Sequence, residues 1–381
     1  MQTLPATAAP PESKAEADGT PGRARGHRVA VVGGDGIGPE VVAEALKVVA
    51  SAGVALETTE YELGAAHYLR TGEVLADTVL DELRDQDAIL LGAVGPPVGD
   101  TSVPSGLLER GLLLRLRFEL DLYVNLRPFR AVPGSIAAAA GAVAGGGPVE
   151  FVVIRENTEG AYAGEGGFLR KGTPDEVATQ GSVNTRMGAE RAVRFAFGLA
   201  EGRPGGRVTL VHKTNVLNYS GDLWRRTFDA VAADHPGIAT GYQHVDAACI
   251  HMVERAYDYD VIVTDNLFGD ILTDLAGAVC GGIGYAASAN LHPGRVSMFE
   301  PVHGAAHDIA GTGRANPVAA ISSAALMLEH LGELDAAAQI EKAVSSYVED
   351  AAQTGAGTSR GSRVPSSMNT AAIGDAIAER L

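Results

Sequence analysis

One stretch near the middle of the chain joins a strand, a turn and a charged helix, and it limits the possible folds more than any other. Tyr259–Thr264 is apolar and β-branched, which predicts a short buried strand. Asp265, Asn266 and Gly269 are turn residues, and a helical pattern follows them. Similar strands and helices alternate along the rest of the chain, so we expect an α/β protein with a largely parallel sheet.

The helix of this stretch carries two carboxylates on one face. Asp270 and Asp274 lie four residues apart, a spacing at which helical side chains are neighbours and like charges repel. A divalent cation held by oxygen ligands would remove that repulsion. Two solvated carboxylates on an ordinary helix are the alternative, and the spacing alone favours this alternative. The metal hypothesis therefore depends on the rest of the chain.

Length and charge exclude several kinds of partner. A chain of 381 residues usually forms two domains. Its net charge of -17 argues against a nucleic acid or an anionic membrane as the main partner. No apolar run approaches the roughly 20 residues that span a bilayer. Cys249 and Cys280 have neither metal-binding nor redox spacing, which fits a reduced, cytoplasmic setting.

The first predicted strand lies between a polar N-terminal tail and a glycine-rich bend. Residues 1–27 are rich in Ala, Pro, Gly and charge, so we expect them to form a disordered tail. Arg28–Gly33 predicts a buried strand, and the glycine-rich bend Gly34–Glu40 leads it into a helix. The bend lacks the full G-x-G-x-x-G pattern of a dinucleotide loop. We interpret it as a place where strand and helix pack closely.

Charged side chains follow or interrupt apolar segments elsewhere. Arg117, Arg127 and Arg155 lie in or directly after such segments, where an unpaired charge would be costly. A guanidinium matches a carboxylate bidentately, so we expect these arginines to bind a carboxylate ligand. Lys213 follows another strand, although a strand-end lysine is usually solvated. Asp246 lies among apolar residues of a helix expected over Gln243–Val253, which indicates a ligand or a partner.

Six short motifs occur in a fixed order along the chain. They are Gly34–Glu40, Asn125–Pro128, Arg155–Gly160, Lys213–Val216, Asp265–Asp270 and Glu300–Gly304. Together they resemble the β-decarboxylating dehydrogenases, the family of 3-isopropylmalate and isocitrate dehydrogenases, from about residue 28 to the C-terminus. The resemblance implies a two-domain fold with a largely parallel sheet and flanking helices, which is not a Rossmann fold. It implies a large domain from residues 28–122 and 281–381, and a smaller substrate and dimerisation domain from residues 123–280.

The resemblance also implies roles for individual residues in a homodimer that shares its active sites. Asp270 and Asp274 would bind Mg²⁺ or Mn²⁺, with Asp246 supplied by the neighbouring subunit. Tyr162 and Lys213 would be the acid–base pair, and Lys213 would again come from the partner chain. The expected cofactor-binding residues are Asn215, Asn266, Glu300, His303, Gly304, Ala305, Ala306, Asp308, Ile309 and Asn316.

The cofactor loop indicates which dinucleotide to expect. Asp308 and Ile309 stand where NADP-using isocitrate relatives have Lys-Tyr. An acidic residue suits a free ribose hydroxyl and repels a 2′-phosphate, so we expect NAD. The loop departs from the family in one respect. Isopropylmalate enzymes usually have Gly-Ser-Ala-Pro-Asp where this chain has Gly-Ala-Ala-His-Asp over residues 304–308.

The helix before the first of these arginines indicates the substrate. Isocitrate enzymes place Ser and Asn there to hold another carboxylate, whereas this chain has Leu113 and Leu114, with Val216 after the lysine. An apolar wall cannot satisfy a further carboxylate, but it would bury an isopropyl group worth roughly 2 kcal/mol. The same helix, predicted over Leu112–Arg117, is one residue longer than in many relatives, so the register of its leucines is open.

The resemblance therefore favours one reaction and leaves two alternatives. It implies NAD-dependent oxidative decarboxylation of (2R,3S)-3-isopropylmalate, a 2-hydroxy dicarboxylate, to 4-methyl-2-oxopentanoate and CO₂ in leucine biosynthesis. Tartrate or D-malate is the alternative substrate, because a leucine wall does not exclude a smaller ligand. The remaining alternative is a catalytically silent family member that acts as a binding partner.

Overall fold

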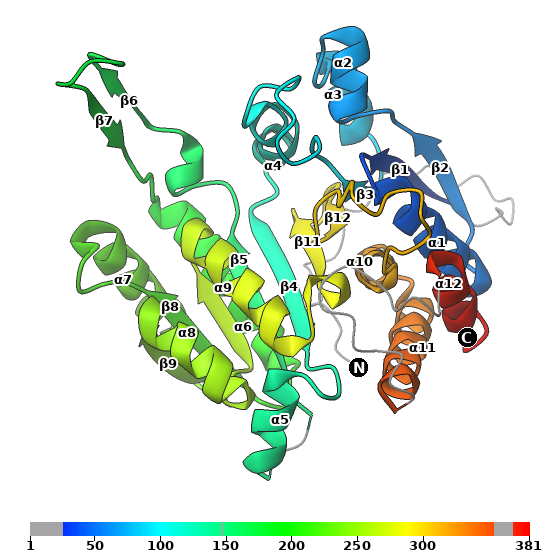
Figure 1. Ribbon diagram of the computed structural model, residues 1–381. Coiled ribbons are helices and arrows are strands. Elements are labelled where there is room, and N and C mark those ends of the chain that lie inside the picture. The colour runs from blue at the N-terminus through cyan, green and yellow to red at the C-terminus, as the bar shows by residue number, and fades with distance from the viewer. Residues whose placement is uncertain (1–25, 146–147, 354–368) are drawn as a thin grey trace, which may run out of the picture. The chain divides into compact units, whose positions relative to one another are not determined.

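The computed structural model describes residues 26–145, 148–353 and 369–381, and it divides the chain into two compact units (Figure 1). Unit 2 comprises Arg117–Ala131 and Ile136–Cys280, and unit 1 comprises the described residues before, between and after these segments. The second division follows Cys280, and the first follows Leu116, six residues before the expected limit at 122. Within the described part of the chain, no helix combines the length and hydrophobicity that a membrane span requires.

The predicted N-terminal tail is only partly covered by the structure. Its residues 1–25 lie outside the described residues. The prediction extended the tail to residue 27, and this limit is wrong by one residue, because β1 (His27–Gly34) already begins at His27. His27 pairs with Leu56 in the neighbouring strand, and this pairing extends the strand beyond its apolar core.

Unit 1 contains five strands with one antiparallel pair. In spatial order they are β2 (Leu56–Glu60), β1, β3 (Ala88–Ala93), β12 (Met298–Pro301) and β11 (Ala287–Leu291). The first four are parallel, and β11 runs antiparallel to β12. Every residue of β3 is buried, as expected of a strand covered on both faces.

Helices cover the unit 1 strands. The described helical segments are α1 (Gly38–Ser51), α2 (Ala65–Thr71), α3 (Asp77–Arg84), η1 (Glu109–Leu114), η4 (Ile283–Tyr285), α10 (Val318–His330), α11 (Leu334–Gln353) and α12 (Thr370–Ala378). Helix α1 packs on β1 and β3, and α10 packs on β11 and β12. Helix α11 packs mainly on α10, and α12 packs mainly on α1.

The glycine-rich bend is a close-packing device, as the sequence predicted. A Cβ atom on Gly38 would lie 2.1 Å from the carbonyl oxygen of Gly33, and one on Gly92 would lie 2.4 Å from the same oxygen. Glycine at these positions therefore allows β1, β3 and the start of α1 to approach one another closely.

The predicted helix over residues 112–117 differs in type and extent. The segment Glu109–Leu114 is a π-helix, η1, and the α-helix α4 (Arg115–Glu119) continues it. A π-turn closes over one more residue than an α-turn, so it absorbs an additional residue within a helix. Such a turn is suited to the one-residue extra length that the family resemblance predicted here.

Unit 2 also contains a five-stranded arrangement. In spatial order its strands are β4 (Val124–Arg130), β5 (Glu150–Glu156), β10 (Val261–Thr264), β8 (Arg207–His212) and β9 (Ala239–His244). Only β4 runs antiparallel to its neighbour β5, and the other pairs are parallel. The carboxyl ends of β5, β10 and β8 therefore meet at one edge, where ligands of α/β sheets commonly bind.

Two groups of helices flank this sheet. They are α6 (Arg186–Glu201) with α7 (Asn218–Asp234), and α5 (Ile136–Val143) with α8 (Val245–Glu254) and α9 (Asn266–Cys280). Right-handed crossovers place α6 and α7 on one face and α8 and α9 on the other. The helix predicted over Gln243–Val253 begins two residues too early, because Gln243 and His244 pair with β8 as the end of β9.

A hairpin that the sequence analysis did not identify completes unit 2. Its strands, β6 (Gly166–Leu169) and β7 (Val177–Gln180), are exposed at every position. The short helices η2 (Ala161–Ala163) and η3 (Ala256–Asp258) precede β6 and β10, respectively.

Candidate active site

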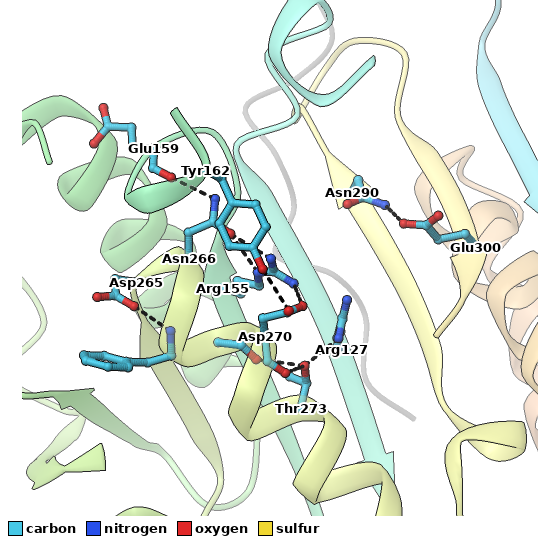
Figure 2. A network of polar contacts seen from close by, with 12 residues as sticks. Arg127, Arg155, Glu159, Tyr162, Asp265, Asn266, Asp270, Thr273, Asn290 and Glu300 are labelled. Carbon is cyan, nitrogen blue, oxygen red and sulfur yellow. Dashed lines mark hydrogen bonds and ion pairs between the residues drawn. The ribbon is translucent and has the colours of Figure 1, made fainter. Parts of the chain in front are cut away.

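Arg155 is the centre of a polar cluster at the carboxyl edge of the unit 2 sheet (Figure 2). Its side chain is only 1% exposed at the end of β5. Nε and Nη2 donate to Oδ1 of Asn266 at 3.0 and 2.8 Å, and Nη1 forms an ion pair with Asp270. A Cβ on Gly269 would lie 2.5 Å from Cγ of Arg155. The turn glycine therefore makes room for this arginine.

Asp270 is shared between Arg155 and Tyr162. The Tyr162 hydroxyl donates to Oδ2 of Asp270 at 2.8 Å, and the Arg155 guanidinium lies 5.1 Å from the centre of the Tyr162 ring. Burial would raise the pKa of Asp270, but the Arg155 charge and the Tyr162 hydrogen bond outweigh it and lower that pKa. Burial raises the pKa of Tyr162, which keeps its hydroxyl protonated.

Asp274 lies one helical turn beyond Asp270 and differs from it in ionisation. Partial desolvation, followed by the negative charge of Asp270, raises the pKa of Asp274. Among the described residues, Asp274 has no hydrogen bond or ion pair to another side chain. The charges of Arg127 and Arg155 act in the opposite direction but do not outweigh these two effects, so the ionised form of Asp274 is disfavoured.

Two further arginines belong to the same cluster. Arg127 is 6% exposed on β4 and donates to Oγ1 of Thr273 on α9 (Figure 2). Arg117 is 8% exposed, and its positive charge contributes to lowering the pKa of Arg155. The structure thus brings together all three predicted carboxylate-binding arginines with Tyr162 and Asp270. Guanidinium groups are suitable partners for carboxylates, so these three arginines are candidates for binding an anionic ligand.

Lys213 and Asp246 form a second, separate pair in unit 2. Nζ of Lys213, directly after β8, lies 2.6 Å from Oδ1 of Asp246 in the first turn of α8. The hydrogen bond from Lys213 lowers the pKa of Asp246. Within the described residues, no group of three His, Cys, Asp or Glu side chains could hold a metal ion. Asp246 therefore does not join Asp270 and Asp274 within one chain, and the three-carboxylate site stays a prediction for two chains.

The structure also shows neighbours of the cluster to which the sequence analysis assigned no role in the site. Oδ1 of Asp265 accepts a hydrogen bond from the Phe268 backbone N–H at 2.8 Å, so Asp265 caps α9. Its other oxygen lies 3.3 Å from Nε2 of His212, which is fully buried beside Lys213. Asp265 thus contacts both α9, which carries Asp270 and Asp274, and the last residue of β8, which precedes Lys213.

Three further residues that were predicted to bind cofactor or substrate differ in burial. They are Asn266, Asn215 and Val216. Asn266 is buried, and its amide Nδ2 donates to the Glu159 carbonyl at 3.0 Å while its oxygen accepts from Arg155. Asn215 and Val216 are exposed in the turn after Lys213, and the Val216 side chain is 62% exposed. Asn266 thus orients Arg155, whereas Asn215 and Val216 present free surface.

The predicted cofactor residues of unit 1 lie in β12, at Glu300, and in the segment between β12 and α10. Glu300 accepts a hydrogen bond from Asn290 at 2.9 Å (Figure 2), and Asn316 caps the start of α10 by accepting from the Val318 N–H at 3.1 Å. His303 is 3% exposed, and within the described chain its Nε2 has no hydrogen-bond partner. Burial lowers the pKa of His303, so its ring is neutral.

The remaining predicted residues of unit 1 divide by burial. Ala305 and Ile309 are buried, Ala306 is half-buried, and Gly304 and Asp308 are exposed. In the π-helix, Leu113 and Leu114 are half-buried, whereas Leu112 is fully buried. The leucines that the sequence assigned to a substrate wall therefore keep exposed surface.

A cavity of about 190 Å³ lies elsewhere in unit 2. Arg207, Arg255 and Tyr259 are among its lining residues, and none of the predicted site residues lines it. Arg207 begins β8, whereas Lys213 follows its other end. The cavity is therefore separate from the candidate site.

Comparison with known proteins identifies the family. The family model described as isocitrate/isopropylmalate dehydrogenase matches residues 28–377. The chain belongs to this family. A relative from Thermobifida fusca, named 3-isopropylmalate dehydrogenase, is 56% identical over 364 residues, which are 94% of this chain and 98% of the relative. Another of that name, from Frankia casuarinae, is 57% identical over 331 residues, 86% of this chain and 94% of the relative.

A solved structure supports the same assignment. Isocitrate dehydrogenase from Methylococcus capsulatus matches with a TM-score of 0.80 and 37% identity, covering 93% of this chain and 99% of that one. The predicted family and fold class are thereby confirmed, including the largely parallel sheets with flanking helices.

Proposed function

We propose that the protein is an NAD-dependent 3-isopropylmalate dehydrogenase that uses Mg²⁺ or Mn²⁺. It would convert (2R,3S)-3-isopropylmalate and NAD⁺ to 4-methyl-2-oxopentanoate, CO₂ and NADH in leucine biosynthesis. The observation that carries the proposal is the buried Arg155, which holds Asp270 together with Tyr162 at the carboxyl edge of the sheet. Relatives that carry this name and align over most of the chain support it.

The carboxylates of α9 fit a divalent cation. Asp274 has a raised pKa beside Asp270, so the pair favours either a proton or a metal ion. Carboxylate oxygens are suitable ligands for Mg²⁺ and Mn²⁺. Asp270 and Asp274 of one chain, with Asp246 of another, would hold the ion.

The loop after β12 fits the adenosine half of a dinucleotide. Nε2 of His303 is buried and has no partner within the described chain, so it offers a hydrogen-bonding position to a ligand. The exposed Asp308 suits the free ribose hydroxyls of NAD and disfavours the phosphate of NADP.

The chain's own residues have defined tasks in the reaction. When bound, the cation would polarise the substrate's hydroxyl oxygen, and NAD would accept hydride from the carbon that bears it. Lys213 would remove the hydroxyl proton. The C–C bond to the β-carboxylate would then break and release CO₂, and Tyr162 would protonate the carbon left as an enolate. Arg117, Arg127 and Arg155 would hold the two carboxylates in the geometry for both steps.

A homodimer with shared sites is part of the proposal. Within one chain, Lys213 pairs with Asp246, whereas the arginines and Asp270 form a separate cluster. Each chain would therefore contribute one part to each of two active sites in the dimer. Helices α8 and α9 pack together, and their exposed apolar side chains support an interface between two copies. These side chains are Ile250, Val253, Leu267 and Ile271. A cytoplasmic location fits the two cysteines, which are free thiols.

NADH formation across a substrate panel tests the proposal. We expect the highest kcat/KM with 3-isopropylmalate and Mg²⁺, lower values with D-malate, tartrate and isocitrate, and loss of turnover in Lys213→Ala. A preference for malate or tartrate would contradict the substrate assignment. No turnover with any of the four would contradict the enzymatic proposal and favour a silent binding partner.

A further inference from the structure

The cofactor loop of unit 1 is attached to its surroundings on both sides of Ala306. Before it, the carbonyl oxygen of Ala305 accepts a hydrogen bond from the Ile37 N–H at 2.8 Å. After it, Nε2 of His307 lies 2.7 Å from the carbonyl oxygen of Gly95. A carbonyl oxygen can only accept, so Nε2 of His307 carries the hydrogen and donates it.

The backbone that His307 contacts is itself fixed. Asp35 is 5% exposed, and its carboxylate accepts hydrogen bonds from the backbone N–H of Gly95 at 3.0 Å and of Ala65 at 2.8 Å. Hydrogen bonds to a carboxylate are stronger than those between neutral groups, so Asp35 helps to hold the backbone at Gly95 in place. The bond from His307 therefore connects the cofactor loop to an ordered part of unit 1.

Ala306, between the two attachments, has an unfavourable backbone conformation. Its φ is +38°, in the left-handed region that residues other than glycine adopt at a cost. Such a conformation persists only where neighbouring contacts enforce it. A Cβ on Gly36 would lie 1.9 Å from the carbonyl oxygen of Ala305, so the loop backbone rests directly on the glycine-rich bend.

We propose that His307 is a positioning residue for the dinucleotide. Its bond to Gly95 holds Gly304–Ile309 in the shape that receives NAD before NAD binds. Isopropylmalate enzymes usually have proline at this position, and proline restricts φ through its own ring. Here a side-chain hydrogen bond supplies the restriction. This inference rests on the proposed function, because it assigns the loop to NAD.

Three variants distinguish an effect on the position of the cofactor loop from an effect on the stability of the whole protein. His307→Ala removes the bond, and His307→Gln keeps a side-chain N–H donor. His330→Ala is the matched control, because Nε2 of His330 also lies within bonding distance of a backbone carbonyl, that of Arg295 at 3.2 Å, in unit 1 but outside the loop.

Two measurements show whether the loop is held before binding. The first is hydrogen–deuterium exchange of the backbone amides of residues 304–310 in the cofactor-free protein. The second is the dissociation constant of NADH, followed by its fluorescence. For His307→Ala we expect faster exchange and about fivefold weaker NADH binding, the effect of one neutral hydrogen bond. The KM for NAD should rise in parallel, whereas kcat and the KM for 3-isopropylmalate should not change.

The two remaining variants and the wild type decide the interpretation. His307→Gln should recover most of the NADH affinity, and His330→Ala should leave both readouts unchanged. Wild-type affinity and exchange in His307→Ala, or an equal loss in His330→Ala, would overturn the positioning role and leave the proposed function intact. A wild-type protein that does not bind NADH would overturn the proposed function itself, and the positioning role with it.

Discussion

Arg155 shows how far sequence reasoning extends at a single residue. Its position directly after an apolar strand predicted a charge that needs a partner, and the structure buries it to 1% exposure. Its partners, Asn266 and Asp270, lie more than 100 residues further along the chain. Local pattern cannot connect positions so far apart. The family resemblance assigned these residues to one active site, and the pairing of β5 with β10 brings them into contact.

Replacing Arg155 with glutamine tests its role in substrate binding. The variant loses a charged, bidentate carboxylate partner, so we expect kcat/KM for 3-isopropylmalate to fall by about 100-fold, as two charged hydrogen bonds would imply. Arg130→Gln is the control, because Arg130 pairs with Glu150 at 3.0 Å on the exposed end of β4. Steady-state kinetics that fall equally in both variants would contradict the role assigned to Arg155.

Asp274 gives a prediction about pH and metal. Its folded-state pKa is raised, so the folded protein binds the proton more tightly than the unfolded chain does. Stability from this group is therefore present in acid and is lost as the pH rises through the range between its ordinary and raised pKa values. In metal-free protein at neutral pH, Asp274→Asn should raise the Tm, with no increase in acid.

In the presence of Mg²⁺, the wild type should have a higher Tm than Asp274→Asn. A ligand at a hundredfold excess over its Kd stabilises a folded protein by about 2.7 kcal/mol, and the variant has lost a ligand for it. Calorimetry with a chelator and with Mg²⁺ would measure both effects. A variant that gained as much from Mg²⁺ as the wild type would exclude Asp274 as a ligand.

At the scale of elements, strands were predicted correctly where burial requires a run of apolar residues, and they were missed where the strand is exposed. The buried strands β1 and β10 were predicted from their apolar sequences, and a strand, β8, was expected before Lys213. The edge strand β2 and the hairpin β6–β7 were not, because they are almost wholly exposed and show no apolar alternation. The π-helix was also not predicted, since its sequence has the composition of an α-helix and only its hydrogen bonding differs.

The cap of α9 gives a prediction at this scale. Asp265→Ala should destabilise the protein by about 1 kcal/mol, the usual cost of a lost helix cap. It should also weaken Mg²⁺ binding, because α9 carries Asp270 and Asp274. Asn369→Ala removes a comparable cap from α12, where the side chain accepts from the Ala372 N–H at 2.7 Å. Titration calorimetry that showed equal Mg²⁺ affinity in the two variants would contradict the role of Asp265.

At the scale of the whole molecule, the predicted site residues of unit 2 form two separate clusters. Unit 2 places Lys213 with Asp246 and, separately, Arg155 with Asp270. The family resemblance predicted that the first pair serves a neighbouring chain. Residue patterns without the resemblance could not have predicted it, because they carry no information about a second chain. We propose that one active site needs both pairs, each supplied by a different chain.

A purified heterodimer tests this claim most directly. One chain would carry Lys213→Ala and the other Asp274→Asn, with a different affinity tag on each. If Lys213 acts in the partner's site, one of the two sites is intact, and NADH formation from 3-isopropylmalate should return to about half of the wild-type rate. The matched heterodimer of Lys213→Ala with Asp246→Asn has no intact site and should stay inactive. A first heterodimer as inactive as its two parent variants would contradict the shared site.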